Sequence, residues 1–174
     1  YRRAYGLDFV SFRYFNACGA DSQSRHGQAP GASHLIARIL EAVKRNESFT
    51  LNGNDYNTPD GTCIRDYVHV SDVADAHILA DEYLQTKLPS QPTLFNLGTG
   101  KGHTVMEVIN TAMTELQIPI TYKFGKRREG DPSRLVANCD LAKQHLNFRP
   151  KHNLKSILRT AYNWYGKQRN RTVV

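Results

Sequence analysis

Short β-rich segments of this chain alternate with longer segments whose apolar residues recur at helical spacing. β-Branched and aromatic side chains predict strands over residues 7–15, 63–70, 93–97 and 120–124, and a further short strand after Ser48. The helical segments follow residues that can cap a helix, namely Ser33, Ser71 or Asp72, Thr104, Asp140 and Asn153. Thr104 and Glu107 also have the spacing of a capping box. Strands that alternate with helices indicate an α/β fold.

The length and composition indicate one ordered domain without a membrane-spanning segment. The chain has 174 residues, of which 10% are aromatic, and no apolar run approaches the roughly 18 residues that a membrane helix needs. The first residues lack the apolar stretch of a secretory signal. Cys18, Cys63 and Cys139 are far apart and form no C-x-x-C pair, so we expect no disulfide framework and no zinc ribbon. A cytoplasmic location follows as an expectation.

The net charge of +7 comes from the C-terminal part of the chain. No Asp or Glu follows Asp140, whereas Lys143, Arg149 and six further Lys and Arg residues do, Arg169 and Arg171 among them. Such an excess can mark a nucleic-acid-binding patch or a solvated helix face. We favour the solvated face, because the nearby aromatic residues cluster on one predicted helix, and we therefore expect no nucleic-acid partner.

Two Arg-bearing segments are the strongest candidates for binding chemistry. The loop from Arg127 to Asp131 and the pair Arg65 and Asp66 can each bind a phosphate through a guanidinium, although either could instead form a surface ion pair. The glycine run at 98–102 follows a strand and precedes a helix, but it lacks both the G-x-G-x-x-G and the P-loop pattern. No histidine motif predicts a metal site. Together with the long polar loop after Asn16, the two Arg segments favour a diphosphate ligand.

Four segments together resemble one known family. They are FRYFNACGA (residues 12–20), GNDYNTPDGTCIRDYVHVSDVADAH (53–77), FNLGTGKGHT (95–104) and RREGDPS (127–133). They are similar to the C-terminal half of the UDP-glucose 4-epimerases, which are extended short-chain dehydrogenase/reductases, and the resemblance runs from Tyr5 to about Trp164. It implies the C-terminal part of a Rossmann-type fold, with residual parallel strands and a small mixed α/β substrate-binding domain. Residues 7–16 and 63–100 are then expected to contribute to the Rossmann sheet.

The resemblance also implies an activity and a cofactor. Enzymes of this family bind NAD in an N-terminal Rossmann domain and invert C4 of a UDP-hexose in galactose metabolism by removing and returning a hydride. Their Tyr-x-x-x-Lys pair precedes the R-Y-F-N strand, whereas Tyr83 and Lys87, which have that spacing here, follow it. We therefore expect a fragment without the catalytic pair and the NAD-binding glycine turn, inactive alone, from a homodimeric protein.

Two other functions remain open at this point. One is another NAD-dependent nucleotide-sugar enzyme, such as a dehydratase, a decarboxylase or a pentose 4-epimerase. The other is a non-catalytic module that binds nucleotide sugars.

The resemblance implies a role for eleven residues. Asn16 would bind the sugar or the diphosphate, the triplet Ser33, His34 and Leu35 would meet phosphate at a helix start, and Arg65 and Arg128 would clamp the diphosphate. Asp131 would accept from the ribose hydroxyls, and Tyr14 and Phe15 would line the nicotinamide side. The other two residues, Asn52 and Leu135, mark departures from the family pattern.

At both departures a smaller or non-aromatic side chain replaces a larger ring. Asn52 stands where many relatives have a Phe that packs on the uracil, which leaves that contact in doubt. Leu135 stands near the place of a large Tyr that restricts bulk at the sugar C2 position. We therefore predict that the full enzyme tolerates N-acetylated sugars.

Overall fold

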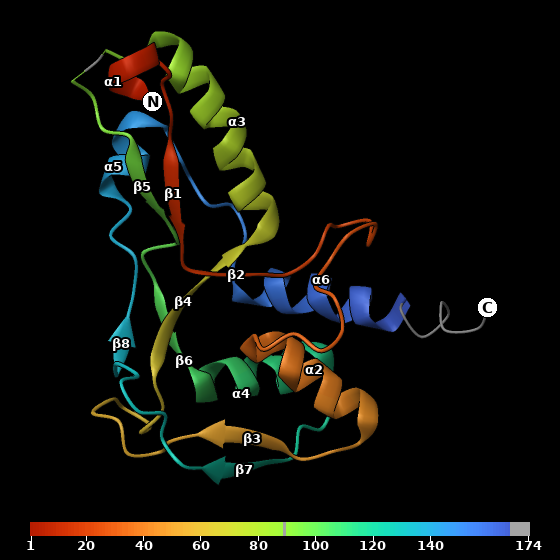
Figure 1. Cartoon of the computed structure of the whole chain (residues 1–174). Coiled ribbons are helices and arrows are strands. Elements are labelled where there is room, and N and C mark those ends of the chain that lie inside the picture. The colour runs from red at the N-terminus through yellow and green to blue at the C-terminus, as the bar shows by residue number, and fades with distance from the viewer. Residues whose placement is uncertain (89, 168–174) are drawn as a thin grey trace.

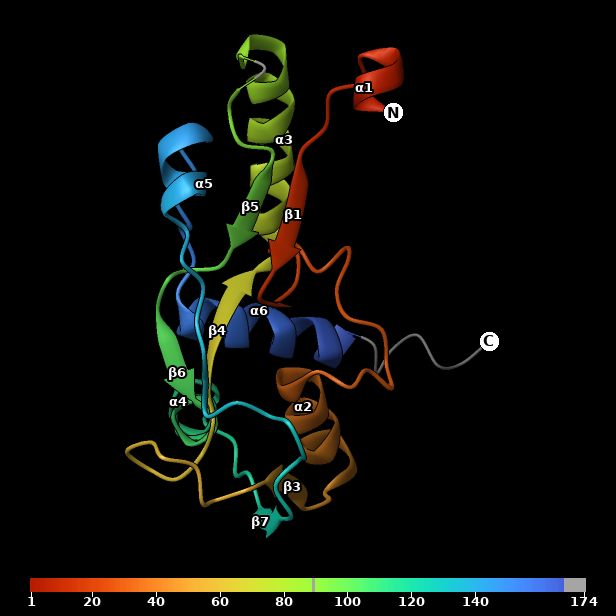
Figure 2. The same cartoon turned by 60° about the vertical axis from the view of Figure 1, so that its left-hand side comes forward.

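The computed structural model describes residues 1–88 and 90–167, and it has mixed α/β architecture (Figure 1). One end of the molecule is built around two parallel strands, β1 (Ser11–Tyr14) and β5 (Leu94–Leu97). Helix α3 (Val70–Thr86) lies along this pair, α5 (Asp140–His145) packs against β5, and the short α1 (Arg2–Tyr5) leads into β1 (Figures 1 and 2). Gly6 closes α1 with a φ of 68°, a left-handed conformation that glycine adopts readily.

The other end of the molecule packs three helices beside a second parallel pair of strands. Helices α2 (Leu35–Arg45), α4 (Val105–Leu116) and α6 (Leu154–Lys167) bury their apolar stripes together. Strands β3 (Phe49–Asn52) and β7 (Tyr122–Gly125) close this layer. The apolar residues form two buried clusters, the larger one here and a smaller one between α3, β5 and α5.

Strand β4 (Ile64–His69) runs between the two ends (Figure 1). Its second half pairs in parallel with β2 (Asn16–Cys18), and its first half pairs with β6 (Gly102–Thr104) and β8 (Arg134–Leu135). Residues 64–69 therefore do not pair with β1 or β5, whereas residues 94–97 of the same segment form β5; the contribution of residues 63–100 to a Rossmann sheet stays a prediction. Strand β4 pairs elsewhere because the chain leaves the first pair after Tyr14, and β2 then offers its edge to β4.

The helix starts follow the capping chemistry in two places and depart from it in others. Thr104 and Glu107 form the expected capping box, and the Asn153 side chain accepts from Ser156 N at 3.0 Å. Ser33 does not cap α2, because the N-cap is His34, whose carbonyl accepts from Arg38 N. The cap of α3 is His69, two residues before Ser71 and three before Asp72, and its side chain accepts from Ser71 N. Asp140 is the first residue of α5 rather than its cap.

The basic residues of α6 form surface ion pairs. Lys155 and Arg159 pair with Glu115 of α4, while Arg169 and Arg171 lie outside the described residues. This arrangement is the solvated helix face that the sequence favoured. Within residues 1–88 and 90–167, no helix combines the length and the apolar character that crossing a bilayer requires.

Candidate functional site

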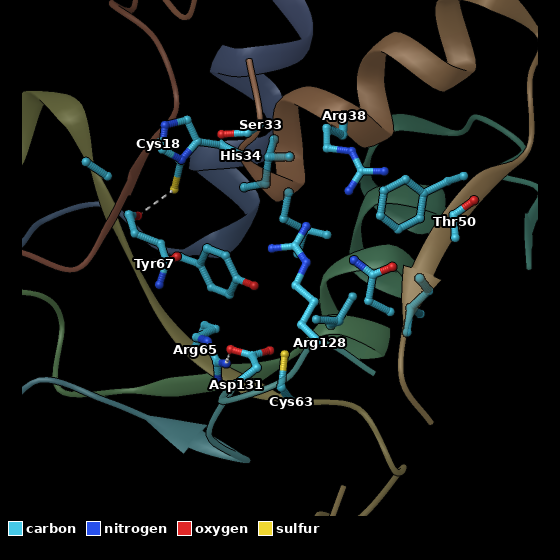
Figure 3. A pocket seen from close by; sticks show the side chains of 18 residues that line it. Cys18, Ser33, His34, Arg38, Thr50, Cys63, Arg65, Tyr67, Arg128 and Asp131 are labelled. Carbon is cyan, nitrogen blue, oxygen red and sulfur yellow. Dashed lines mark hydrogen bonds and ion pairs between the residues drawn. The ribbon is translucent and has the colours of Figure 1, made fainter. Parts of the chain in front are cut away.

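The largest concentration of predicted binding residues lines one pocket of about 290 Å³. The pocket lies between β2, the first turn of α2, β3, β4 and the loop that follows β7 (Figure 3). Eight of the eleven residues named from the sequence line it, namely Asn16, Ser33, His34, Leu35, Asn52, Arg65, Arg128 and Asp131. These residues come from five segments of the chain, so the pocket exists only in the folded structure.

Three of the named residues lie outside this pocket. Tyr14 and Phe15 are at the end of β1, where the Tyr14 hydroxyl is 2.9 Å from Nε2 of His77 on α3. Leu135 is half exposed on β8, in register with Arg65 of β4 but not part of the pocket lining. The residues predicted to contact the nicotinamide, and the residue predicted to lie near C2 of the sugar, are therefore apart from the eight residues that line the pocket.

Arg65 and Asp131 form an ion pair at one end of the pocket, although 65 residues separate them in the chain. The Tyr56 hydroxyl donates to the other oxygen of the Asp131 carboxylate at 2.9 Å. Burial, and then this carboxylate, raise the pKa of Tyr56 to about 12, so the hydroxyl keeps its proton and remains a donor. The guanidinium of Arg127 lies 4.0 Å from the centre of the Tyr56 ring and completes the cluster.

Arg128, in the loop after β7, is held by a residue of strand β3. The side-chain amide of Asn52, oriented with its oxygen toward the guanidinium, accepts from Arg128 Nε at 2.9 Å and from Nη2 at 3.2 Å. Arg128 makes no ion pair within the described residues. Its positive charge is therefore positioned by a neutral group and stays available to an anion in the pocket.

Asp66 organises the segments behind the pocket and is fully buried. Its carboxylate accepts from Thr99 N and Thr99 Oγ1 at 2.9 and 2.7 Å, from Gly100 N at 2.9 Å and from Ala137 N at 3.2 Å. Its main-chain carbonyl accepts from Nδ2 of Asn16 at 2.9 Å and so orients that side chain. Asp66 thus does not pair with its neighbour in sequence.

The same contacts decide the role of the glycine run at 98–102. The amide groups of Thr99 and Gly100 point to the Asp66 carboxylate, and neither residue lines the pocket. These two main-chain N–H groups therefore bond to the protein and do not face a ligand in the pocket. Tyr83 and Lys87 do not line the pocket either. The hydroxyl of the buried Tyr83 donates to the carbonyl of Pro92.

The sequence reasoning missed several residues of the site. Three of them are Arg38, Thr50 and Tyr56. Arg38 and Thr50 line the pocket through the packing of α2 and β3, and Tyr56 reaches the site through its hydrogen bond to Asp131. Cys18 also lines the pocket, and burial raises the pKa of its thiol, which donates to the Asn16 carbonyl at 3.2 Å. A cationic residue one turn into an amphipathic helix, as at Arg38, is the one signal that could have been used.

Comparison with known proteins shows the family of the chain. Residues 1–98, more than half of the chain, match the NAD dependent epimerase/dehydratase family. The chain belongs to this family. A family member from Azospirillum brasilense, named UDP-glucose 4-epimerase, is 46% identical over 166 residues, which cover 92% of this chain and 47% of that protein. One of the same name from Rhizobium meliloti (strain 1021) is 42% identical over 165 residues, 94% of this chain and 50% of that protein.

The fold is shared with solved structures of the family. The UDP-glucose 4-epimerase of Bifidobacterium longum, in complex with NAD⁺ and UDP, is 30% identical and superposes with a TM-score of 0.85. The superposition covers 97% of this chain and 50% of that one. The chain thus spans about half the length of the curated relatives and the solved chain that it matches.

Proposed function

We propose that the chain forms the UDP-sugar-binding part of a UDP-glucose 4-epimerase, an enzyme that inverts C4 of the hexose through NAD. The observation that carries this proposal is that Arg65 and Arg128 share one pocket with Asn16 and with the first turn of α2. Two guanidinium groups beside a helix N-terminus provide the charge and the N–H donors that a diphosphate needs. The names of the relatives, and the UDP bound to one of them, support a uridine nucleotide as the ligand.

Each pocket residue then has a part of the ligand to bind. Arg65 and Arg128 clamp the diphosphate, with Ser33, His34 and Leu35 offering main-chain N–H groups at the start of α2. Asp131 keeps free lone pairs beside its contacts to Arg65 and Tyr56, so it can still accept from ribose hydroxyls. Asn16, oriented by the carbonyl of Asp66, binds on the sugar side.

NAD is expected to contact the chain at the end of β1. Dinucleotides bind beyond the carboxyl ends of parallel strands, and the half-exposed Tyr14 and the neighbouring Phe15 lie at that end of β1. The hydroxyl of Tyr14 is held by His77, so its ring presents a fixed face to a nicotinamide. NAD supplies the hydride acceptor, and residues 1–174 contain neither the dinucleotide-binding glycine turn nor a correctly placed Tyr-x-x-x-Lys pair. We therefore propose that this chain binds UDP-sugar without catalysing epimerisation, in an enzyme that is homodimeric and cytoplasmic.

One finer assignment, the tolerance of N-acetylated sugars, remains a prediction. Tolerance of N-acetylated sugars depends on Leu135, which lies outside the pocket lining. Turnover of UDP-N-acetylglucosamine by the complete enzyme tests it, and no turnover beside good turnover of UDP-glucose would contradict it.

The test of the binding function is titration of the chain with UDP by isothermal calorimetry. We expect saturable binding, and we expect Arg65→Ala to weaken it at least about tenfold, because a charge-assisted contact is lost and the Asp131 carboxylate loses its ion-pair partner. Arg45→Ala, at the exposed end of α2, is the matched control and should leave the affinity unchanged. Absence of UDP binding, or an equal effect of the two variants, would refute the proposal.

A further inference from the structure

We propose that Arg38 is the stacking platform for the nucleobase in this pocket, in place of an aromatic ring. This inference rests on the proposed function and names a specificity-determining residue of the same site. The planar guanidinium of Arg38 stacks on the face of the base, where another site would use an aromatic side chain.

The geometry of Arg38 suits this role. Arg38 lies in the first turn of α2, lines the pocket, and places its guanidinium carbon 5.3 Å from the centre of the Phe49 ring. Phe49 is only 3% exposed, so the ring is a fixed support for the guanidinium. Arg38 forms no ion pair or hydrogen bond through its side chain with any part of 1–88 or 90–167. Its polar edge is therefore left for a ligand.

The position of Arg38 separates it from the phosphate contacts. Figure 3 shows Arg38 and Thr50 at one end of the pocket and Arg65 with Asp131 at the other, with Arg128 reaching into the space between. The ribose joins the base to the diphosphate. A ribose beside Arg128 that turns its hydroxyls toward Asp131, with its diphosphate between Arg128 and the start of α2, therefore leaves the base to fill the end beside Thr50. Arg38 is the planar group at that end.

No aromatic ring of the pocket is available for stacking at the end beside Thr50. The lining has three aromatic rings: Phe49 and Tyr67, which are 3% and 4% exposed, and the imidazole of His34, which lies on the side away from Thr50 (Figure 3). Phe49 is covered by Arg38 itself, and Tyr67 lies on the side of the pocket away from Thr50 (Figure 3). The amide of Asn52 is engaged with Arg128. The base therefore meets the guanidinium of Arg38 rather than a ring.

The chemistry of a guanidinium matches that of uracil. Arg is planar and weakly hydrated, so it stacks on aromatic rings, and proteins use Arg planes as well as aromatic rings to stack nucleobases. Its N–H groups can also donate to the keto oxygens of uracil from the edge of the plane. Lys has the same charge but offers no such plane.

Calorimetric titration of the chain with UDP and with inorganic pyrophosphate, the latter by competition, tests the proposal. We compare Arg38→Lys and Arg38→Met with Arg45→Met, a control on the exposed end of the same helix. Both Arg38 variants should weaken UDP about tenfold and leave pyrophosphate unchanged, since only the base loses its contact. A general loss of structure would weaken both ligands.

The outcomes separate this inference from the function on which it rests. If Arg38→Lys binds UDP as the unaltered chain does, or if pyrophosphate weakens in parallel with UDP in a variant whose circular dichroism and melting match those of the unaltered chain, Arg38 acts as a charge on phosphate and the platform is refuted. Unchanged UDP affinity in both variants refutes it as well. If the unaltered chain binds no UDP, the proposed function fails first.

Discussion

Asp66→Asn is the substitution whose effect on stability follows most directly from the structure. The buried carboxylate accepts four hydrogen bonds, two on each oxygen, from Thr99, Gly100 and Ala137. Asparagine has the same shape but replaces one acceptor oxygen by an NH₂ donor. If the NH₂ takes the position of Oδ2, two main-chain N–H groups face a donor.

The less damaging orientation places the NH₂ at Oδ1. The Thr99 hydroxyl can then rotate and accept, but the Thr99 main-chain N–H loses its partner, and the remaining bonds lose their ionised acceptor. A hydrogen bond to a charged group contributes roughly 1.5–3 kcal/mol, so we expect the free energy of unfolding to fall by about 2–3 kcal/mol. That is a large fraction of the roughly 5–15 kcal/mol typical of a domain.

Urea denaturation followed by circular dichroism measures this loss, provided that the slope of the transition is unchanged. Asp81→Asn, on the exposed face of α3, is the control and should shift the unfolding free energy by less than about 0.5 kcal/mol. An Asp66→Asn variant as stable as that control would show that the four contacts do not hold the loop.

Two further predictions concern neighbouring features of the fold. Gly98→Ala should lower stability by about 1–3 kcal/mol in thermal denaturation, because a Cβ there would lie 2.5 Å from Oδ2 of Asp66, whereas Gly166→Ala, with nothing within 4 Å, should be neutral or stabilising. Burial, and then a neighbouring imidazole, lower the pKa of His69 from 6.5 to about 4, so between these pH values the unfolded chain binds a proton that the folded chain does not. Stability should therefore fall by up to about 3 kcal/mol as the pH drops from 6.5 to 4, and His69→Gln should flatten this dependence in denaturation curves measured across that range.

The order of strands and helices could be predicted from the sequence because it depends on neighbours a few residues apart. Thr104 and Glu107 are three residues apart, and the cap that they form needs no tertiary contact. Asn153 is a similar case, with its side chain bonded to Ser156. The residues of the pocket were named in advance for another reason, the resemblance of four segments to a family.

Pairings across long stretches of chain could not be predicted in this way. Asp66 follows Arg65 directly and was considered as its partner, yet successive side chains of a strand point to opposite faces. Arg65 therefore pairs with Asp131 in the pocket, while Asp66 turns inward to Thr99, Gly100 and Ala137. The pairing of β4 with β2, β6 and β8 was not predicted either, because the residues of a strand do not indicate which edge it will meet.

Local residue patterns thus predicted the longer helices and strands, though not the short strands β2, β6 and β8, and the family resemblance indicated which charged groups are expected to bind an anion. Only the folded chain determined that Asn52 holds Arg128, that Tyr56 holds Asp131 and that Arg38 covers Phe49. Those contacts join residues between 11 and 76 positions apart. Their geometry depends on how α2, β3 and the loop after β7 pack, and no short stretch of sequence contains that information.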